Sequence, residues 1–197
     1  MKTKKIAIAI LLLLIYSNSY SQDNNLFLSL DGGLNKLLAQ SRDYKDGFSI
    51  GGKIGYKFHH NFISGIKIDY SSNKPPNPQL SGNNSVTFIH GGESIKLGIK
   101  AFIQYGNFKA NAKLIPYFLI GAGADLFRQA EANTLEFGSL NGSRFSLNVG
   151  LDFAVGLGFK MIDNTTIYIE PKFTGSFPGG ISAQTSASVK AGVMYSF

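Results

Sequence analysis

The chain has 197 residues, of which 44% are hydrophobic and 16% are charged, and it contains neither Cys nor Trp. One domain is therefore expected, and disulfides, thiolate metal sites and Cys-attached lipid anchors are excluded. The formal net charge of +7 does not indicate nucleic-acid binding, because Lys2, Lys4 and Lys5 lie at the very start and the remaining lysines are scattered singly. We therefore expect no nucleic-acid partner.

The first segment, 1–21, has the layout of a secretory signal peptide. Its basic start is followed by a continuous apolar run over 6–16, and the small residues Ser19 and Ser21 precede a cleavage site after Ser21. The apolar run is short for a bilayer-spanning helix, although an N-terminal membrane anchor is the alternative. We expect a cleaved signal peptide over 1–21 and one domain over 22–197.

Beyond residue 22, apolar and polar residues alternate with a period of two, which indicates strands with one apolar and one polar face. The stretch 145–160 is the clearest, because every odd-numbered residue from Phe145 to Phe159 is apolar. Such a face is long for a globular strand and suits a tilted membrane strand. In chain order, the expected strands are 26–34, 48–58, 62–70, 95–105, 114–127, 145–160, 166–173 and 188–197.

The strand 114–127 is the least regular, because it is apolar on both faces. An outward-facing set is nevertheless expected on it. That set is Phe118, Ile120, Ala122 and Ala124.

The connections between these strands alternate in length. The short ones are 59–61, 106–112 and 161–164, and the long ones are 35–47, 71–93, 128–143 and 174–182. Long extracellular loops, short periplasmic turns and an even number of strands are typical of bacterial outer-membrane barrels. The sequence therefore predicts an all-β fold, an eight-stranded antiparallel up-and-down transmembrane β-barrel with a periplasmic N-terminus.

Aromatic residues stand at both ends of the apolar faces. The expected girdles are Phe48, Tyr70, Phe145 and Phe173 at the extracellular end, and Phe58, Phe62, Tyr105 and Phe159, with Tyr195 and Phe197, at the periplasmic end. Two aromatic girdles around an apolar belt are what the two membrane interfaces select. The apolar faces are therefore expected to contact lipid rather than to fill the interior, as they do in a soluble barrel such as a lipocalin.

The polar faces carry charges that a closed barrel places in its lumen. The expected cluster is Lys53, Lys67, Asp69, Lys100, Asp152, Glu170, Lys172 and Lys190. Because buried charges need partners, we expect a polar plug, with a narrow gated pore as the alternative. A turn near 162–163 would place Asp152 opposite Lys172, and we expect these two residues to form an ion pair.

Histidines offer few candidates for chemistry. His59 and His60 lie in a short turn, where a solvated pair is more usual than a metal site. His90, Glu93 and Ser94 are close together in sequence near the expected outer rim. A barrel enzyme that modifies lipids would act from this rim, but the spacing of the three residues matches no established motif. We therefore expect no catalytic residue, no metal and no cofactor.

Three features carry a family resemblance. They are Gly55–Tyr56 at a strand end, Pro116 and Tyr117 with Gly121 and Gly123 on one strand, and the final strand 190–197. Through them, most of 26–197 resembles the small outer-membrane barrels of the OmpA/OmpX type. In the final strand, the positions of the family's assembly signal are occupied by Lys190, Gly192, Tyr195 and Phe197.

The resemblance implies recognition by the barrel-assembly machinery and a monomer surrounded by lipid in the outer membrane of a Gram-negative bacterium. It also implies a structural or surface-interaction role, in which an unidentified extracellular ligand binds the four long loops. A narrow porin-like channel is the alternative, and a rim-active lipid-modifying enzyme is less favoured. We therefore expect that the protein is not an enzyme.

Overall fold

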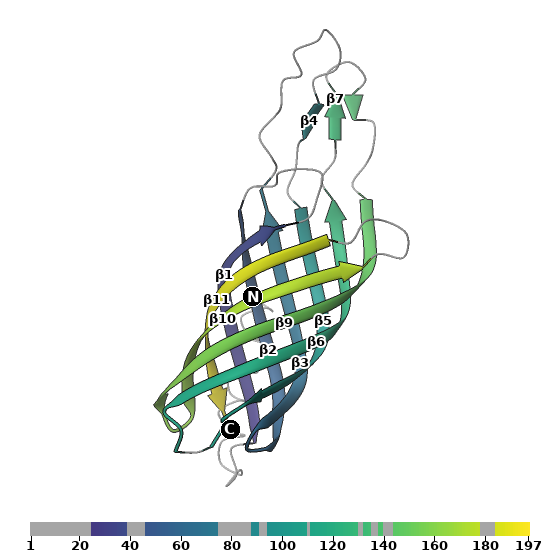
Figure 1. Cartoon of the computed structure of the whole chain (residues 1–197). Helices are drawn as coiled ribbons and strands as arrows, with labels where there is room; N and C mark the ends of the chain where they lie inside the picture. The colour runs from purple at the N-terminus through teal and green to yellow at the C-terminus, as the bar shows by residue number, and fades with distance from the viewer. Residues whose placement is uncertain are drawn as a thin grey trace, which may run out of the picture.

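Eight long strands close into one antiparallel barrel in the computed structural model of the chain (Figure 1). They are β1 (Leu26–Leu37), β2 (Gly47–His59), β3 (Phe62–Asn73), β5 (Ser94–Gly106), β6 (Leu114–Gln129), β9 (Arg144–Ile162), β10 (Thr165–Phe177) and β11 (Gln184–Ser196). Each strand pairs with the next along the chain, and β1 closes the barrel by pairing with β11. The predicted eight-stranded up-and-down barrel is thus confirmed.

The structure describes residues 25–38, 46–74, 88–90, 94–109, 111–129, 132–134, 138–139, 144–177 and 184–197. The expected signal peptide 1–21, and parts of each of the four long connections, lie outside these residues. Within them, no helix is both long and apolar enough to cross a membrane.

The two ends of the barrel differ. We call the end that carries the four long connections the loop end. The other, the turn end, carries His60–Asn61, 107–113 and Asp163–Asn164 together with both ends of the barrel sequence, Leu26 and Ser196.

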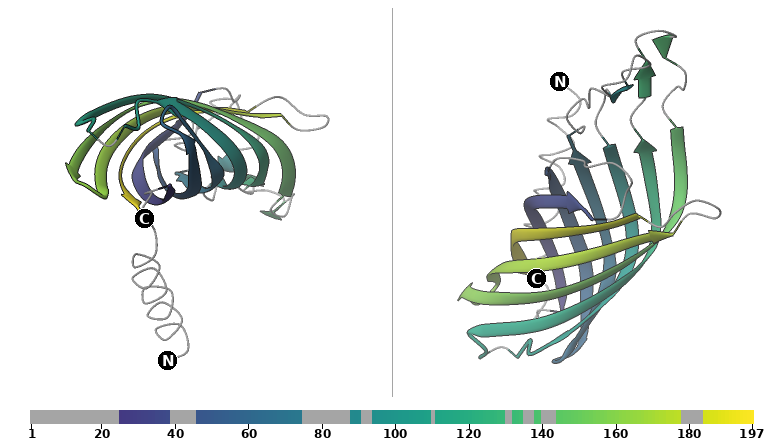
Figure 2. Two further views of the ribbon diagram at one scale, coloured as in Figure 1. Left: turned by 90° about the horizontal axis from the view of Figure 1, so that it is seen from below. Right: turned by 45° about the horizontal axis from the view of Figure 1, so that its top comes forward.

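Two connections expected to be loops, 71–93 and 128–143, contain short strands. β4 (Phe88–His90) pairs with β7 (Ala132–Thr134), and β7 pairs with β8 (Gly138–Ser139). This three-stranded sheet stands beyond the loop end of the barrel (Figures 1 and 2). The alternation of apolar residues did not predict this sheet, because strands of two or three residues are too short to show a period of two.

Apolar side chains cover the outer wall as the alternation predicts. On β9, Phe145, Leu147 and Val149 are 65%, 73% and 61% exposed. The outward set expected on β6, Phe118, Ile120, Ala122 and Ala124, is exposed as well.

The aromatic residues of the outer wall contact one another at both ends. Ring centroids are 5.9 Å apart in the pair Phe48–Tyr70 near the loop end and 5.0 Å apart in the pair Phe62–Tyr105 near the turn end. One expectation is wrong: Phe197 is not exposed on the outer face but is buried, at 6% exposure. Its ring packs edge-on against Tyr195 with centroids 4.9 Å apart, and its amide donates to the Leu26 carbonyl at 2.8 Å.

An apolar core fills the lumen near the turn end, which the sequence analysis did not anticipate. Its buried members are Phe27, Ile63, Phe102, Phe108, Ile115, Tyr117, Leu119, Ala154, Tyr168 and Met194. Ile115, Tyr117 and Leu119 are the inward residues of β6, which explains why this strand is apolar on both faces. Gly156 provides room for the core, because a Cβ atom at this position would collide with the ring of Tyr117.

Candidate functional site: the charged lumen

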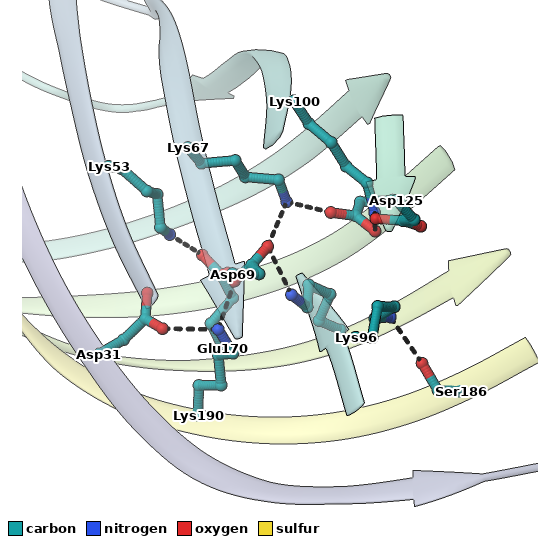
Figure 3. A network of polar contacts seen from close by, with 12 residues as sticks. Asp31, Lys53, Lys67, Asp69, Lys96, Lys100, Asp125, Glu170, Ser186 and Lys190 are labelled. Carbon is teal, nitrogen blue, oxygen red and sulfur yellow. Dashed lines mark hydrogen bonds and ion pairs between the residues drawn. The ribbon is translucent and has the colours of Figure 1, made fainter. Parts of the chain in front are cut away.

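On the loop-end side of the apolar core, all eight barrel strands place charged side chains in the lumen. Each of these residues is at most 8% exposed. They are the cations Lys53, Lys67, Lys96, Lys100, Lys172 and Lys190, and the anions Asp31, Asp69, Asp125, Asp152 and Glu170. Because every strand contributes and the side chains meet in the middle, the network ties opposite walls of the barrel together (Figure 3).

The part of the network next to the apolar core is built around Glu170. Lys53 forms an ion pair with Glu170, and the Tyr117 hydroxyl donates to the same carboxylate at 2.8 Å. The Lys53 ammonium also lies 4.7 Å from the centre of the Tyr168 ring, a cation–π distance. Tyr168 in turn donates to Asp31 at 2.9 Å. Two tyrosines therefore join the apolar core to the charged layer.

Asp69 and Lys190 form the centre of the network. The Lys190 ammonium is 2.5 Å from Asp69 Oδ1 and 2.7 Å from Asp31 Oδ1. The second oxygen of Asp69 lies 3.0 Å from the Lys172 ammonium and 3.8 Å from that of Lys67. Asp69 is thus shared by three lysines from three strands, and this sharing offsets part of the cost of burying them.

Asp152 and Asp125 lie toward the loop end. Asp152 is 2.5 Å from the Lys67 ammonium and 2.9 Å from that of Lys100. Lys100 also lies 2.9 Å from Asp125, which accepts a hydrogen bond from the Ser176 hydroxyl at 2.5 Å.

The expected ion pair between Asp152 and Lys172 is wrong. The register places Asp152 opposite Thr174 and Lys172 opposite Ala154. The turn at Asp163–Asn164 and a register shift between Thr165 and Thr166 displace the two strands from the predicted pairing. Asp152 therefore pairs across the lumen with β3 and β5 rather than with the neighbouring strand.

Lys96 differs from the other lumen lysines. Its ammonium donates to the Ser186 hydroxyl at 3.3 Å (Figure 3). No ion pair between described residues includes Lys96. Among the described residues, the buried charges are therefore six cations and five anions.

All eight residues of the predicted lumen cluster are buried inside the barrel. The prediction missed five members of the network, which are Asp31, Lys96, Tyr117, Asp125 and Tyr168. The period of two assigns Lys96 and Tyr168 to the polar faces of their strands. Asp31 and Asp125 were overlooked because their strands were the two least regular, and the tyrosines because their hydroxyl groups were not counted as partners for the charges.

The histidine candidates do not assemble into a site. His59 and His60 are exposed at the turn end with ring centroids 3.8 Å apart. Reduced solvation, followed by the charges of His59 and Lys109, lowers the pKa of His60 below its usual value. In the second group, His90 lies in β4 and Ser94 begins β5, while Glu93 lies outside the described residues. Among the described residues, no three possible ligands are grouped as a metal ion requires.

Comparisons with known proteins identify the fold. No family model matches the chain, and no curated protein matches it in sequence. Neisserial surface protein A, a solved structure, is 20% identical with a TM-score of 0.55, over 87% of this chain and 97% of that one. The N-terminal β-barrel domain of Pseudomonas aeruginosa OprF is 12% identical with a TM-score of 0.50, over 87% and 98% of the two chains. At these identities the likeness establishes the fold, which is that of the small outer-membrane β-barrels.

Proposed function

Because the chain has the fold of the small outer-membrane β-barrels, we propose that it is an integral outer-membrane protein of a Gram-negative bacterium. Its role is structural or surface-interacting, through its extracellular loops, and it is neither an enzyme nor an open pore. Its apolar outer wall supports insertion in lipid, since a contiguous exposed apolar belt of this extent is unfavourable in water.

The observation that carries the proposal is the filled lumen. Leu119 and Asp152 are both 0% exposed, one in the apolar core and one in the charged layer. Between Phe27, Lys53 and Tyr168 a cavity of only about 10 Å³ remains, which at most holds a single water molecule. A barrel of eight strands is just wide enough for its own side chains, and ions would have to displace these side chains to pass.

The surface role is supported by the sheet β4–β7–β8. This sheet joins the second and third long connections and stands beyond the loop end of the barrel (Figure 2). We propose that an extracellular ligand binds these loops, and that the protein is monomeric in the membrane.

Planar-bilayer recording tests the closed lumen. The purified barrel should give no steady conductance, because the apolar core and the ion pairs block the path. A variant in which Phe108 and Leu119 of the core and Lys67 and Asp152 of the charged layer are all replaced by Ala widens the path at both levels, and its conductance serves as the control for insertion. Steady single-channel currents from the unmodified protein would favour the narrow channel instead.

The surface role is tested by measuring how well whole cells bind candidate extracellular ligands. Cells that express the intact barrel are compared with a deletion strain and with cells whose barrel has 75–93 and 130–143 replaced by tight turns. The proposal expects the shortened barrel to reach the membrane in normal amount while binding falls to the level of the deletion strain. Equal binding by both barrels would contradict a role for these loops.

A further inference from the structure

A hollow lies on the outer wall of the barrel, although residues of the inner face, including Lys172, also contribute to its lining. Its volume is about 610 Å³, within the range of about 300–1,000 Å³ that is usual for small-molecule sites. It extends over β1, β11, β10, β9 and β6, which are consecutive in the barrel. We call it the wall hollow.

The register shows that the outward-facing side chains lining the wall hollow form two rows. Residues directly opposite each other on paired strands share a face of the sheet. The row nearer the loop end is Lys36, Ala187, Phe173 and Phe153. The second row is Leu34, Val189, Pro171, Val155 and Phe118.

Pro171 and Ala187 account for the depth of the wall hollow. Proline has no N–H to donate to the neighbouring strand, and the pairing of β10 with β9 is interrupted at Glu170 and Pro171. Ala187 adds only a methyl group beside this gap. The floor is therefore low, while the bulky side chains of Phe153 and Phe173 stand at its edge.

The wall hollow runs obliquely down the barrel. Lys36 stands next to the last residue of β1, at the loop end, whereas Phe118 lies near the start of β6, toward the turn end. With the orientation given by the proposed function, on which this inference rests, one end reaches the headgroups of the outer leaflet. The other end lies within the hydrocarbon, where water is a poor occupant of an apolar surface.

Two charged residues line the end at the headgroups. Lys36 is exposed on the outer face, and no ion pair between described residues includes it. Asp46, which precedes β2, is also exposed there. A lysine at the membrane surface attracts a lipid phosphate, and the carboxylate of Asp46 weakens this attraction.

We propose that the wall hollow is a binding site for one lipid of the outer leaflet whose phosphate-bearing headgroup has a net negative charge. An acyl chain lies along the low floor of Pro171 and Ala187, and the phosphate is bound by Lys36. The shape supplies the selectivity for a chain, and Lys36 supplies the selectivity for an anionic headgroup. A second copy of the barrel is the competing occupant of the same surface.

The absence of Trp from the chain allows a direct test with one introduced fluorophore at a time. Phe173→Trp places a tryptophan in the wall hollow, which we call the hollow probe. Tyr70→Trp places a tryptophan on β3, which contributes no lining residue, and we call it the reference probe. Both proteins are folded into phosphatidylcholine vesicles that contain the same mole fraction of either brominated phosphatidylglycerol or brominated phosphatidylcholine.

Quenching by the brominated lipids reports which lipid lies beside each probe. The hollow probe should show a relative association constant about fivefold higher for the anionic lipid, the factor that one lysine near a membrane provides. The reference probe should show no preference between the two lipids.

Matched variants, each made in the Phe173→Trp protein, separate charge from shape. Lys36→Gln should abolish the preference of the hollow probe, whereas Lys74→Gln, a change to an exposed lysine just after β3, should leave it unchanged. Asp46→Asn should increase the preference. Ala187→Phe fills the floor and should reduce quenching of the hollow probe by both lipids, while Ala191→Phe, four residues along on the same outer face, should not.

Three results would overturn the proposal. Equal quenching of the hollow probe by both lipids, with normal quenching of the reference probe, would show that the wall hollow selects no headgroup, and would leave the proposed function intact. Protection of the hollow probe from both lipids would show that another protein copy covers the wall hollow. Absence of quenching at the reference probe as well would contradict membrane insertion itself, and with it the proposed function.

Discussion

Asp152 of β9 lies 2.5 Å from Lys67 of β3, although these two strands do not pair and the contact crosses the lumen. Asp152→Asn should destabilise the barrel by about 3–5 kcal/mol, because it removes an anion that the buried Lys67 and Lys100 share. Adding Lys67→Met should restore part of this loss. Urea titration of the protein folded in detergent measures both effects.

The control for this cycle is a lumen lysine that pairs with a different anion. Lys53→Met should show much weaker coupling to Asp152→Asn, since Lys53 pairs with Glu170. If Lys67→Met were simply additive with Asp152→Asn, while Lys53→Met showed strong coupling, the arrangement across the lumen would be wrong.

The faces of the strands were predictable from the sequence, whereas the partners inside the barrel were not. A period of two assigns Lys67 and Asp152 to the same interior whatever the register. Which side chains meet depends on the stagger of the strands. A turn at Asp163–Asn164, together with a register shift between Thr165 and Thr166, places Asp152 opposite Thr174 instead of Lys172. Alternation contains no information about that shift.

The apolar core, the three-stranded sheet and the wall hollow were harder to predict from the sequence. The apolar core was not anticipated because the inward faces of the strands were expected to be polar, and the apolar residues Tyr117 and Leu119 were treated as an irregularity of one strand. The sheet that joins β4 to β7 has no periodic pattern, because each of these strands has only 3 residues. The wall hollow arises from Pro171 on a strand that otherwise reads as regular.

Gly156 provides a test of the packing against Tyr117. Gly156→Ala should lower the free energy of unfolding by about 1–3 kcal/mol, the usual cost of overfilling a packed core, because the new methyl group meets the Tyr117 ring. Gly32→Ala is the control, since the nearest atom to a Cβ there is the Ser49 carbonyl oxygen at 3.7 Å. Equal costs at the two positions would argue against a tightly filled core.

The orientation of the barrel is testable because the chain has no Cys. Ser139→Cys in β8 should react with a membrane-impermeant maleimide on intact cells, because the loop end faces outward in the proposed function. Asp163→Cys, in the turn between β9 and β10, should react only after the outer membrane is permeabilised. Labelling of the Asp163 variant alone on intact cells would reverse the orientation.

Cleavage of the N-terminal segment can be detected by measuring the intact mass of the protein. The protein extracted from the outer membrane should begin at Gln22, because Ser19 and Ser21 suit the cleavage site of a signal peptide. Intact-mass measurement decides this, and Ser21→Leu should slow cleavage. A mature protein that retains Met1 would contradict the export of the chain by a cleaved signal peptide.

Phe197 has two separable roles, one in the folded barrel and one in assembly. Its amide donates to Leu26 at 2.8 Å, across the seam where β11 meets β1, and its ring packs against Tyr195. Deleting Phe197 removes this packing and the terminal aromatic residue that the assembly machinery is expected to recognise. We expect the deleted protein to accumulate unfolded in the periplasm, detected by loss of the heat-modifiable band on a gel.

Folding without the machinery distinguishes the two roles. If Phe197 acts chiefly as a signal, the deleted chain should still fold when diluted from urea into detergent, at a modest cost in stability. Phe197→Tyr keeps an aromatic ring at the seam and should assemble in cells more efficiently than Phe197→Ala. The signal would be the wrong explanation if deletion left assembly in cells normal. Failure to fold in detergent as well would instead assign the defect to the seam between β1 and β11.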